Sequence, residues 1–208
     1  MGASPTRVVG IVLAAGAGER AGGPKALRRD PGIAGTAGMP WLLRATTALR
    51  EGGCAAIIVV LGAESDRARD LVPMGVTIVV APDWAQGLSA SFRAGLAAAH
   101  HDDATAALIT LVDLPGLPSA AVARLLSEPA TATTLRRAQY AGRPGHPVVL
   151  GRDHWEAAAA SATGDRGAGS YLRAQGAELV DCSDLWDGAD VDGADVDGAD
   201  TDGPAPAA

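Results

Sequence analysis

Residues 8–25 have the sequence VVGIVLAAGAGERAGGPK, in which a short apolar run passes directly into a glycine-rich stretch. The run is rich in valine and isoleucine, as is typical of a β-strand that is buried in a parallel sheet. Gly16 and Gly18 follow it, and backbone without Cβ atoms lets several N–H groups point at one set of phosphate oxygens. These residues predict an α/β fold whose first strand ends in a phosphate-binding loop.

Two cations lie in or next to this loop. Lys25 is the only lysine of the chain beside sixteen arginines, and Arg20 stands five positions before it. The arginine offers a planar fork and the lysine a compact point charge, and both suit phosphate oxygens. A simple turn with a solvated Lys25 is the alternative. The spacing fits neither the P-loop, which needs a hydroxyl after the lysine, nor the dinucleotide pattern Gly-x-Gly-x-x-Gly.

The segment 13–25 resembles a known signature. Its pattern, Leu-Ala-Ala-Gly-x-Gly-x-Arg-x-Gly-x-Pro-Lys, is similar to that of the nucleotidyltransferases that attach a nucleotide to molybdopterin. The resemblance implies a Rossmann-like nucleotidyltransferase fold, a loop that wraps a nucleoside triphosphate, and catalytic roles for Arg20 and Lys25. Ala21 departs from the pattern, because this position usually holds a larger residue. The nucleotide-binding residues implied are Leu13, Ala14, Ala15, Gly16, Ala17, Gly18, Arg20 and Lys25.

The overall composition limits the class of protein. The 208 residues fit one domain with a full-sized core, and 48% apolar residues with 3% aromatics predict an interior of alanine, valine and leucine. The sequence shows no signal peptide and no apolar run near about 18 residues, so we expect a soluble, cytoplasmic protein with no membrane partner. Basic residues form no stripe with interleaved aromatics, which argues against a nucleic-acid partner.

The net charge of −7 belongs to one end of the chain. From Asp181 onward there are nine aspartates and no basic residue, so residues 1–180 are mildly basic, as an anionic substrate prefers. This end also repeats, because Gly-Ala-Asp-Val/Thr-Asp occurs three times in succession from Gly188. We expect a nucleotidyltransferase domain over 1–187 and an acidic, low-complexity, mostly disordered tail over 188–208.

Apolar runs alternate with amphipathic stretches along the first two thirds of the chain. This order predicts a doubly wound, mostly parallel α/β sheet with right-handed crossovers. The expected strands span about 7–15, 56–61, 76–81 and 106–112, and the expected helices about 40–51, 64–71, 88–101 and 118–127, with start signals at Pro40, Ser89 and Pro118. Ligands of such sheets bind outside the carboxyl ends of the strands, so the loops 16–25, 82–89 and 113–117 should meet at one site.

The loop at 82–89 holds two candidate nucleotide contacts. Gly87 permits close approach of the backbone, and Ser89 stands where a helix begins, with its N-terminus toward a ligand. A simple helix cap is the alternative for Ser89. The segment resembles the family, in which a glycine and a serine-bearing helix start line the nucleotide pocket. This implies that Gly87 and Ser89 contact the base or the ribose.

Asp113 is the strongest catalytic candidate. It directly follows the apolar strand 108–112, and a carboxylate at this edge can hold Mg²⁺, which keeps several waters and bridges phosphate oxygens. Capping of the next turn is the alternative. The strand-Asp-x-Pro pattern resembles the family's metal-binding aspartate, which implies Asp113 as a catalytic residue and Mg²⁺ ligand. Family members often end in an Asp-x-Asp stretch that returns to the active site, which implies Asp192 or Asp190 as a second metal contact.

The second half of the chain supplies the acceptor side. Strands at about 133–140 and 143–150 should form a small β-hairpin. Gly-His-Pro at 145–147, and the sequence TGDRGA at 163–168 opening a helix, resemble the molybdenum cofactor cytidylyltransferases, in which these segments face a pterin-bearing acceptor. A structural or surface histidine is the alternative for the first segment. The acceptor-binding residues implied are His146, Asp165 and Arg166.

These parts indicate one mechanism. An acceptor phosphate attacks the α-phosphorus of a nucleoside triphosphate, Mg²⁺ offsets phosphate charge, and Arg20 and Lys25 stabilise the departing pyrophosphate. The nucleophile is already an anion, so no general base is needed. The sequence Leu-Ala-Ala-Gly at 13–16 resembles the cytidylyltransferases, whereas guanylyltransferases tend to have Leu-Ala-Gly-Gly, which favours CTP over GTP. The resemblance also implies that this protein contacts a molybdoenzyme that receives the cofactor.

Other functions remain open beside this one. A molybdopterin guanylyltransferase would use the same parts with GTP. Some bacterial relatives with this loop are NAD(P)H-dependent reductases of the nicotine blue oxidoreductase type, although the unmatched dinucleotide spacing argues against such a role. A nucleotide-binding accessory protein that carries the cofactor without catalysis is a third possibility.

Overall fold

A computed structural model describes residues 6–19, 22–30 and 38–191 of the chain. Its centre is a seven-stranded sheet in the order β3-β2-β1-β4-β6-β5-β7. The strands are β1 (Val8–Ala14), β2 (Ala56–Leu61), β3 (Thr77–Val80), β4 (Ala106–Leu111), β5 (Leu135–Tyr140), β6 (Arg143–Gly151) and β7 (Glu178–Asp181). The helices are α1 (Trp41–Glu51), α2 (Ser65–Arg69), α3 (Leu88–His100), α4 (Ser119–Leu125), α5 (Trp155–Ser161) and α6 (Gly169–Ala174), with short 3-10 turns η2 (Lys25–Leu27), η3 (Trp84–Gln86) and η4 (Arg152–His154).

β1 forms the middle of the parallel part of the sheet. It pairs in parallel with β2 on one side and β4 on the other, and all seven of its residues are buried. A strand that is covered on both faces has no polar face, which explains the continuous apolar run in the sequence. The expected doubly wound, mostly parallel α/β sheet is therefore confirmed, with strand bounds within two residues of those predicted.

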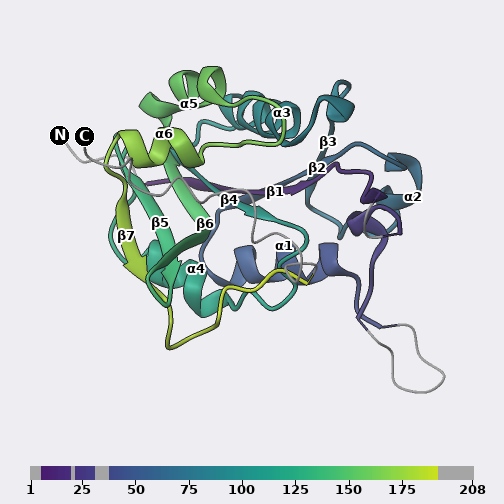
Figure 1. Cartoon of the computed structure of the whole chain (residues 1–208), viewed down its shortest axis with the longest axis horizontal. Coiled ribbons are helices and arrows are strands. Elements are labelled where there is room, and N and C mark those ends of the chain that lie inside the picture. The colour runs from purple at the N-terminus through teal and green to yellow at the C-terminus, as the bar shows by residue number, and fades with distance from the viewer. Residues whose placement is uncertain (1–5, 20–21, 31–37, 192–208) are drawn as a thin grey trace, which may run out of the picture.

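Helices cover both faces of the sheet (Figure 1). α1 and α4 lie against one face, and α3, α5 and α6 lie against the other. Gly95 lets α3 approach β1 closely, since a Cβ at this position would lie only 2.8 Å from Cγ2 of Ile11. Each face has its own apolar cluster, so the sheet separates two halves of the core. This layering brings the loops after β1, β3 and β4 to the carboxyl edge of the sheet.

The expected hairpin is present as β5 and β6. Ala141 and Gly142 form its two-residue turn with φ of 49° and 77°, the left-handed conformation that such tight hairpins require. β6 also pairs antiparallel with β4, and it is the described strand that runs against the others. The hairpin therefore joins the parallel sheet next to β4, beside the carboxyl edge.

The structure differs from the sequence prediction at a few elements. α5 and β7 were not expected; both are short elements at the margin of the fold, where packing rather than a long apolar pattern decides the conformation. The segment 163–168 is a turn, closed by backbone hydrogen bonds between Thr163 and Arg166, and α6 begins only at Gly169. α3 begins at Leu88, as the expected helix at 88–101 does, but Gly87 rather than Ser89 stands at its N-cap position and no side chain caps it.

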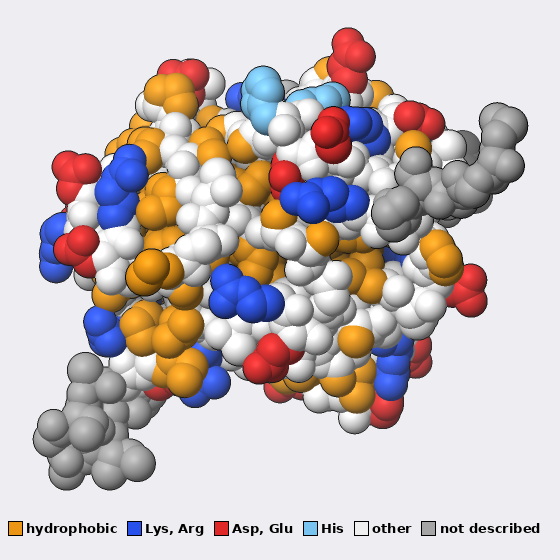
Figure 2. Space-filling view, turned by 180° about the vertical axis from the view of Figure 1, so that it is seen from behind, with side chains coloured by type: hydrophobic (Ala, Val, Ile, Leu, Met, Phe, Trp, Pro, Cys, Tyr) orange, Lys and Arg blue, Asp and Glu red, His pale blue; other side chains and the backbone are white. Residues whose placement is uncertain are grey.

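The surface carries charge of both signs. On the face shown in Figure 2, acidic and basic side chains lie dispersed among polar and apolar ones. No helix within the described ranges is long and apolar enough to span a bilayer.

Candidate active site

A cavity of about 600 Å³ opens at the carboxyl edge of β1 and β4. Its walls come from the three loops that the sequence predicted to converge and from the C-terminal segment. The sequence-predicted residues that line it are Leu13, Ala14, Ala15, Gly16, Ala17, Gly18, Lys25, Gly87, Asp113, Asp165 and Asp190. Arg20 and Asp192, also predicted for this site, lie outside the described residues.

The glycine-rich loop after β1 is folded tightly on itself. Gly23 donates its N–H to the carbonyl of Gly18 at 3.0 Å, and Gly18 has a φ of 61°. A Cβ on Gly18 would lie 2.1 Å from the Gly23 oxygen, so a side chain at position 18 would push this turn open. A Cβ on Gly16 would meet nothing within 4 Å. The backbone at Gly16 therefore borders open space in the cavity, as a phosphate-binding loop requires.

Lys25 and Asp113 meet across the cavity wall. The Nζ of Lys25 lies 2.9 Å from Oδ2 of Asp113, and the two side chains are only 24% and 17% exposed. Asp113 stands just beyond β4, where Val112 donates its N–H to Leu13 and continues the pairing with β1. The sequence predicted both residues for one site, and the structure brings them into contact.

The other carboxylate oxygen of Asp113, Oδ1, does not take part in this ion pair. Oδ1 is buried and has no hydrogen-bond partner among the described residues. Buried polar atoms are nearly always bonded, and a charged oxygen without a partner costs more than a neutral one. An oxygen of this kind, in the wall of a cavity, is suited to a bound cation or a ligand donor.

The C-terminal segment returns to this site, and we call residues 182–191 the C-terminal strap. Val191 donates its N–H to the carbonyl of Asp113 at 3.2 Å, and Asp190 lines the cavity. Trp186 packs edge-on against Tyr140 with ring centroids 5.3 Å apart. Thus Asp190 is the tail aspartate that the structure shows at the site, whereas Asp192 lies outside the described residues.

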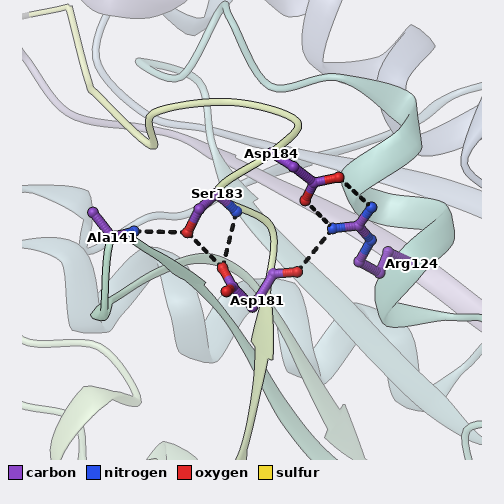
Figure 3. Close-up of polar contacts among 5 residues, drawn as sticks. All are labelled: Arg124, Ala141, Asp181, Ser183 and Asp184. Atoms are coloured by element: carbon purple, nitrogen blue, oxygen red, sulfur yellow. Dashed lines mark hydrogen bonds and ion pairs between the residues drawn. The ribbon is translucent and has the colours of Figure 1, made fainter.

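Polar contacts fix the start of the strap (Figure 3). Arg124 of α4 makes two hydrogen bonds to the carboxylate of Asp184 and one to the carbonyl of Asp181. Ser183 donates to Asp181 and accepts the N–H of Ala141 in the hairpin turn. The hydrogen bond from Arg124 lowers the pKa of Asp184, and those from Ser183 lower the pKa of Asp181. Both carboxylates therefore stay ionised over a wide pH range.

The loop after β3 and the turn at 163–166 are joined. The N–H of Ser89 donates to the carbonyl of Gly164 at 2.9 Å, and a Cβ on Gly87 would lie 2.5 Å from Oδ1 of Asp165. Ser89 is 1% exposed and does not line the cavity. The structure therefore does not bring Ser89 to the predicted nucleotide pocket, because its amide is used by the neighbouring turn. Ser91, two residues on, lines the cavity instead.

The three predicted acceptor residues separate in space. Asp165 lines the cavity, whereas Arg166 is exposed and does not. His146 lies in β6 behind the cavity wall, with Nδ1 3.4 Å from the carbonyl of Ile109. Burial, and then the nearby charge of Arg137, lower the pKa of His146 to about 4, so the ring is neutral near neutral pH. The structure supports direct contact with a ligand in this cavity for Asp165 alone among the three.

Several lining residues were not assigned from the sequence. They are Trp84, Ala85, Leu88, Ser91, Leu111 and Val112, together with Glu19 of the glycine-rich loop. Trp84 had one available signal, because it follows a predicted strand at the carboxyl edge of the sheet. Leu111 and Val112 lie at and just beyond the end of β4, and Glu19 lies in the glycine-rich loop. Ala85, Leu88 and Ser91 are small or apolar residues of η3 and α3, and their position depends on how these two elements pack.

A parallel α/β sheet with a glycine-rich loop, a lysine and an aspartate at its carboxyl edge has the arrangement of nucleotidyltransferases of the Rossmann-like class. Residues 10–179 match the MobA-like NTP transferase domain. The chain belongs to this family, whose members are of the nucleotidyltransferase type.

The chain is also similar to individual proteins over most of its length. It is 37% identical over 203 residues to the nicotine blue oxidoreductase of Paenarthrobacter nicotinovorans, covering 89% of this chain and 92% of that protein. The crystal structure of Rv0371c from Mycobacterium tuberculosis H37Rv is similar with a TM-score of 0.70 and 28% identity, over 86% and 88% of the two chains. A complex of Rv0371c with manganese is similar with a TM-score of 0.65 and 26% identity, over 85% and 87%.

Proposed function

We propose that this protein transfers a nucleoside monophosphate, CMP in preference, from a nucleoside triphosphate to a phosphorylated acceptor of the pterin type and releases pyrophosphate. The proposal rests on the contacts of the two carboxylate oxygens of Asp113. One of its oxygens pairs with Lys25, and the other is buried, unpartnered among the described residues and next to a cavity lined by the glycine-rich loop. This arrangement suits a triphosphate with a cation.

A divalent cation fits the donor atoms at this place. Mg²⁺ commonly takes one or two protein carboxylates and completes its shell with waters and substrate phosphates. Asp113 offers an unpartnered oxygen, and Asp190 lines the same cavity. The described residues contain no group of three or more histidine, cysteine or acidic side chains that could hold a metal by themselves. The manganese complex of Rv0371c supports a divalent cation here, and Asp192 remains a prediction.

The protein's own groups would divide the remaining work. Backbone N–H groups near Gly16 and Gly18 would hold phosphate oxygens, and Nζ of Lys25 would offset charge on the phosphates and the departing pyrophosphate. When bound, the cation would add further neutralisation of phosphate charge. Arg20 is proposed for the same task from its place in the signature. The acceptor phosphate is already an anion, so the site needs no pair of nucleophile and base.

The preference for CTP and for a pterin-type acceptor rests on sequence resemblance. The Leu-Ala-Ala-Gly segment and the segments around His146 and Asp165 are similar to those of molybdenum cofactor cytidylyltransferases. Asp165 lines the cavity and is proposed to contact the acceptor. His146 and Arg166 would then act from outside the described cavity wall, by shaping the acceptor side. Contact with a molybdoenzyme that receives the product is part of the same proposal.

A second candidate function is an NAD(P)H-dependent reduction. It is favoured by the 37% identity to nicotine blue oxidoreductase over nearly the whole chain. The glycine spacing at Gly16, Gly18 and Gly22 departs from the dinucleotide pattern, which favours transfer over reduction.

One set of assays separates these functions. The protein is incubated with Mg²⁺ or Mn²⁺, molybdenum cofactor and α-labelled CTP or GTP, and pyrophosphate release is measured. In parallel, NADPH absorbance is followed with a quinone-like dye. We expect label on the acceptor from CTP. Transfer of GMP alone would contradict the CTP preference, and NADPH oxidation without pyrophosphate release would contradict nucleotidyl transfer itself.

A further inference from the structure

The cavity lining carries both charged and apolar side chains. The charged ones are Lys25, which is ion-paired with Asp113, and the carboxylates of Glu19, Asp113, Asp165 and Asp190. Trp84 and Leu88 line the cavity as well, and both pack against the apolar cluster on the α3 face of the sheet. A polyphosphate in this cavity therefore needs a divalent cation with it, and a planar apolar group finds a surface at Trp84 and Leu88.

Trp84 differs from the other tryptophans of the chain. Trp41 and Trp155 are core residues, only 5% and 1% exposed, and Trp186 packs against Tyr140 in the strap. Trp84 is partly exposed and lines the cavity. Its indole makes no contact with another ring or with a guanidinium among the described residues. Trp84 is therefore the tryptophan that offers part of its ring surface to the cavity.

The position of Trp84 is fixed by its surroundings. A Cβ on Gly62, just after β2, would lie 2.6 Å from both Cβ and Cγ of Trp84 and 2.6 Å from the carbonyl oxygen of Ala15. The glycine thus lets the indole lie close against the loop that follows β1. Gly87 also donates its N–H to the carbonyl of Trp84 at 3.0 Å, which closes the η3 turn. The ring is held in place before any ligand binds.

We propose that the Trp84 indole is the stacking platform for the base of the bound nucleotide, and so a residue that sets affinity for the nucleoside part. This inference rests on the proposed function. A nucleoside triphosphate presents a planar ring at one end and phosphates at the other, so it can use both the apolar surface at Trp84 and Leu88 and, with its cation, the charged groups at Lys25 and Asp113. Stacking of a base on an aromatic side chain tolerates different bases, so Trp84 contributes affinity for any nucleotide while neighbouring groups choose the base. Leu88 and Ser91 lie three positions apart on α3 and line the same cavity, so they can contact the edge of a base that stacks on Trp84.

Binding measurements test the platform directly. Dissociation constants for CTP and for inorganic tripolyphosphate are measured by titration calorimetry, with Mg²⁺, on the wild type, Trp84→Leu and Trp84→Phe. Leucine keeps apolar volume without an aromatic face, and phenylalanine keeps the face. We expect Trp84→Leu to weaken CTP about tenfold and Trp84→Phe to weaken it less, because base stacking on aromatic residues has this magnitude. Tripolyphosphate, which has no base, should bind all three proteins equally, which also shows that the variants fold.

The outcomes separate this inference from the proposed function. Equal loss of CTP and tripolyphosphate affinity in Trp84→Leu, or unchanged CTP affinity, would overturn the platform. A rise in the KM of the acceptor with unchanged CTP binding would overturn it as well and place the acceptor on the indole. A third outcome combines two results: the wild type binds CTP but transfers no nucleotide, and Trp84→Leu loses affinity for CTP alone. This outcome would support the platform and contradict the transfer reaction.

Discussion

At the scale of single residues, the candidate site is built on a pair of charges and on Oδ1 of Asp113, which has no hydrogen-bond partner among the described residues. Lys25 and Asp113 hold each other at 2.9 Å in a partly buried setting, so removing either side chain breaks this ion pair at the cavity. Sequence reasoning found both residues, because charge at the end of an apolar strand is a local signal. It missed Trp84 of η3, although this residue follows a predicted strand at the carboxyl edge of the sheet. It also chose Ser89 rather than Ser91, because the packing of α3 decides which side chains of that helix reach the cavity.

Lys25→Arg should lower kcat about tenfold or more. In the wild type, the compact ammonium of Lys25 reaches Asp113 at 2.9 Å in a mostly buried position. The wider guanidinium of an arginine does not fit this space, so Asp113 and the phosphates lose a correctly placed positive charge. Steady-state kinetics of pyrophosphate release measure the effect. Arg69→Met, on the exposed side of α2, is the control and should keep wild-type turnover. Near-normal turnover of Lys25→Arg would show that Lys25 pairs with Asp113 without contacting the phosphates of the reacting nucleotide.

His146 should make the fold sensitive to acid. Burial, and then the charge of Arg137, lower its pKa to about 4 from an ordinary value of 6.5, against weaker opposite effects of the hydrogen bond with the Ile109 carbonyl and of the charge of Asp113. Between these two values the unfolded chain binds a proton that the folded chain does not, so stability falls as pH falls through this window. Thermal unfolding from about pH 7 to about pH 5 should therefore show a larger drop in Tm for the wild type than for His146→Gln. Parallel curves would contradict this role of His146.

At the scale of elements, the carboxyl edge of the sheet and the C-terminal strap build the site together. The parallel strands were predictable because buried strands are continuous apolar runs. The hairpin was predictable because the conformation of its two-residue turn depends only on residues that are neighbours in the sequence. The strap's course was not predictable. It depends on contacts that are distant in sequence, such as Arg124 with Asp184 and Val191 with Asp113.

Gly188→Ala should displace the strap. Gly188 has a φ of 77°, and a Cβ there would lie 2.4 Å from Cδ2 of Tyr140. The shift should move Asp190 away from the cavity, raise the Mg²⁺ concentration needed for half-maximal activity several-fold, and leave most of the fold's stability intact. Metal titrations of activity measure it. Gly176→Ala is a matched control, because its φ is 65° but a Cβ there meets nothing within 4 Å; an equal effect in both variants would show backbone strain rather than strap displacement.

At the scale of the whole molecule, the chain is a nucleotidyltransferase-type sheet whose C-terminal strap reaches back to the candidate active site. The mildly basic body and the acidic end were both visible in the sequence. The choice of nucleotide and acceptor could not be fixed in this way. It depends on a few contacts in the cavity, and relatives of this fold include a protein named as an oxidoreductase.

Two truncations separate the part of the tail that serves the site from the repeats that follow it. A chain that ends after Gly193 keeps Asp190 and Asp192 and should retain wild-type activity and Tm. A chain that ends before Asp190 loses the cavity-lining carboxylate and the hydrogen bond from Val191 to Asp113, so its metal requirement should rise and its turnover fall about tenfold or more. Equal activity of the two truncated chains would contradict a role for the strap in the site.

Nucleotide transfer itself provides the most direct test of the central claim. Wild type and Asp113→Asn are given α-labelled CTP, Mg²⁺ and molybdenum cofactor, and label on the acceptor is counted against pyrophosphate released. We predict equal amounts of both products with the wild type and a rate about a hundredfold lower with Asp113→Asn, because the amide keeps the shape but loses the charge that the cation and Lys25 need. Absence of labelled acceptor with every nucleoside triphosphate, or an unchanged rate in Asp113→Asn, would contradict the account.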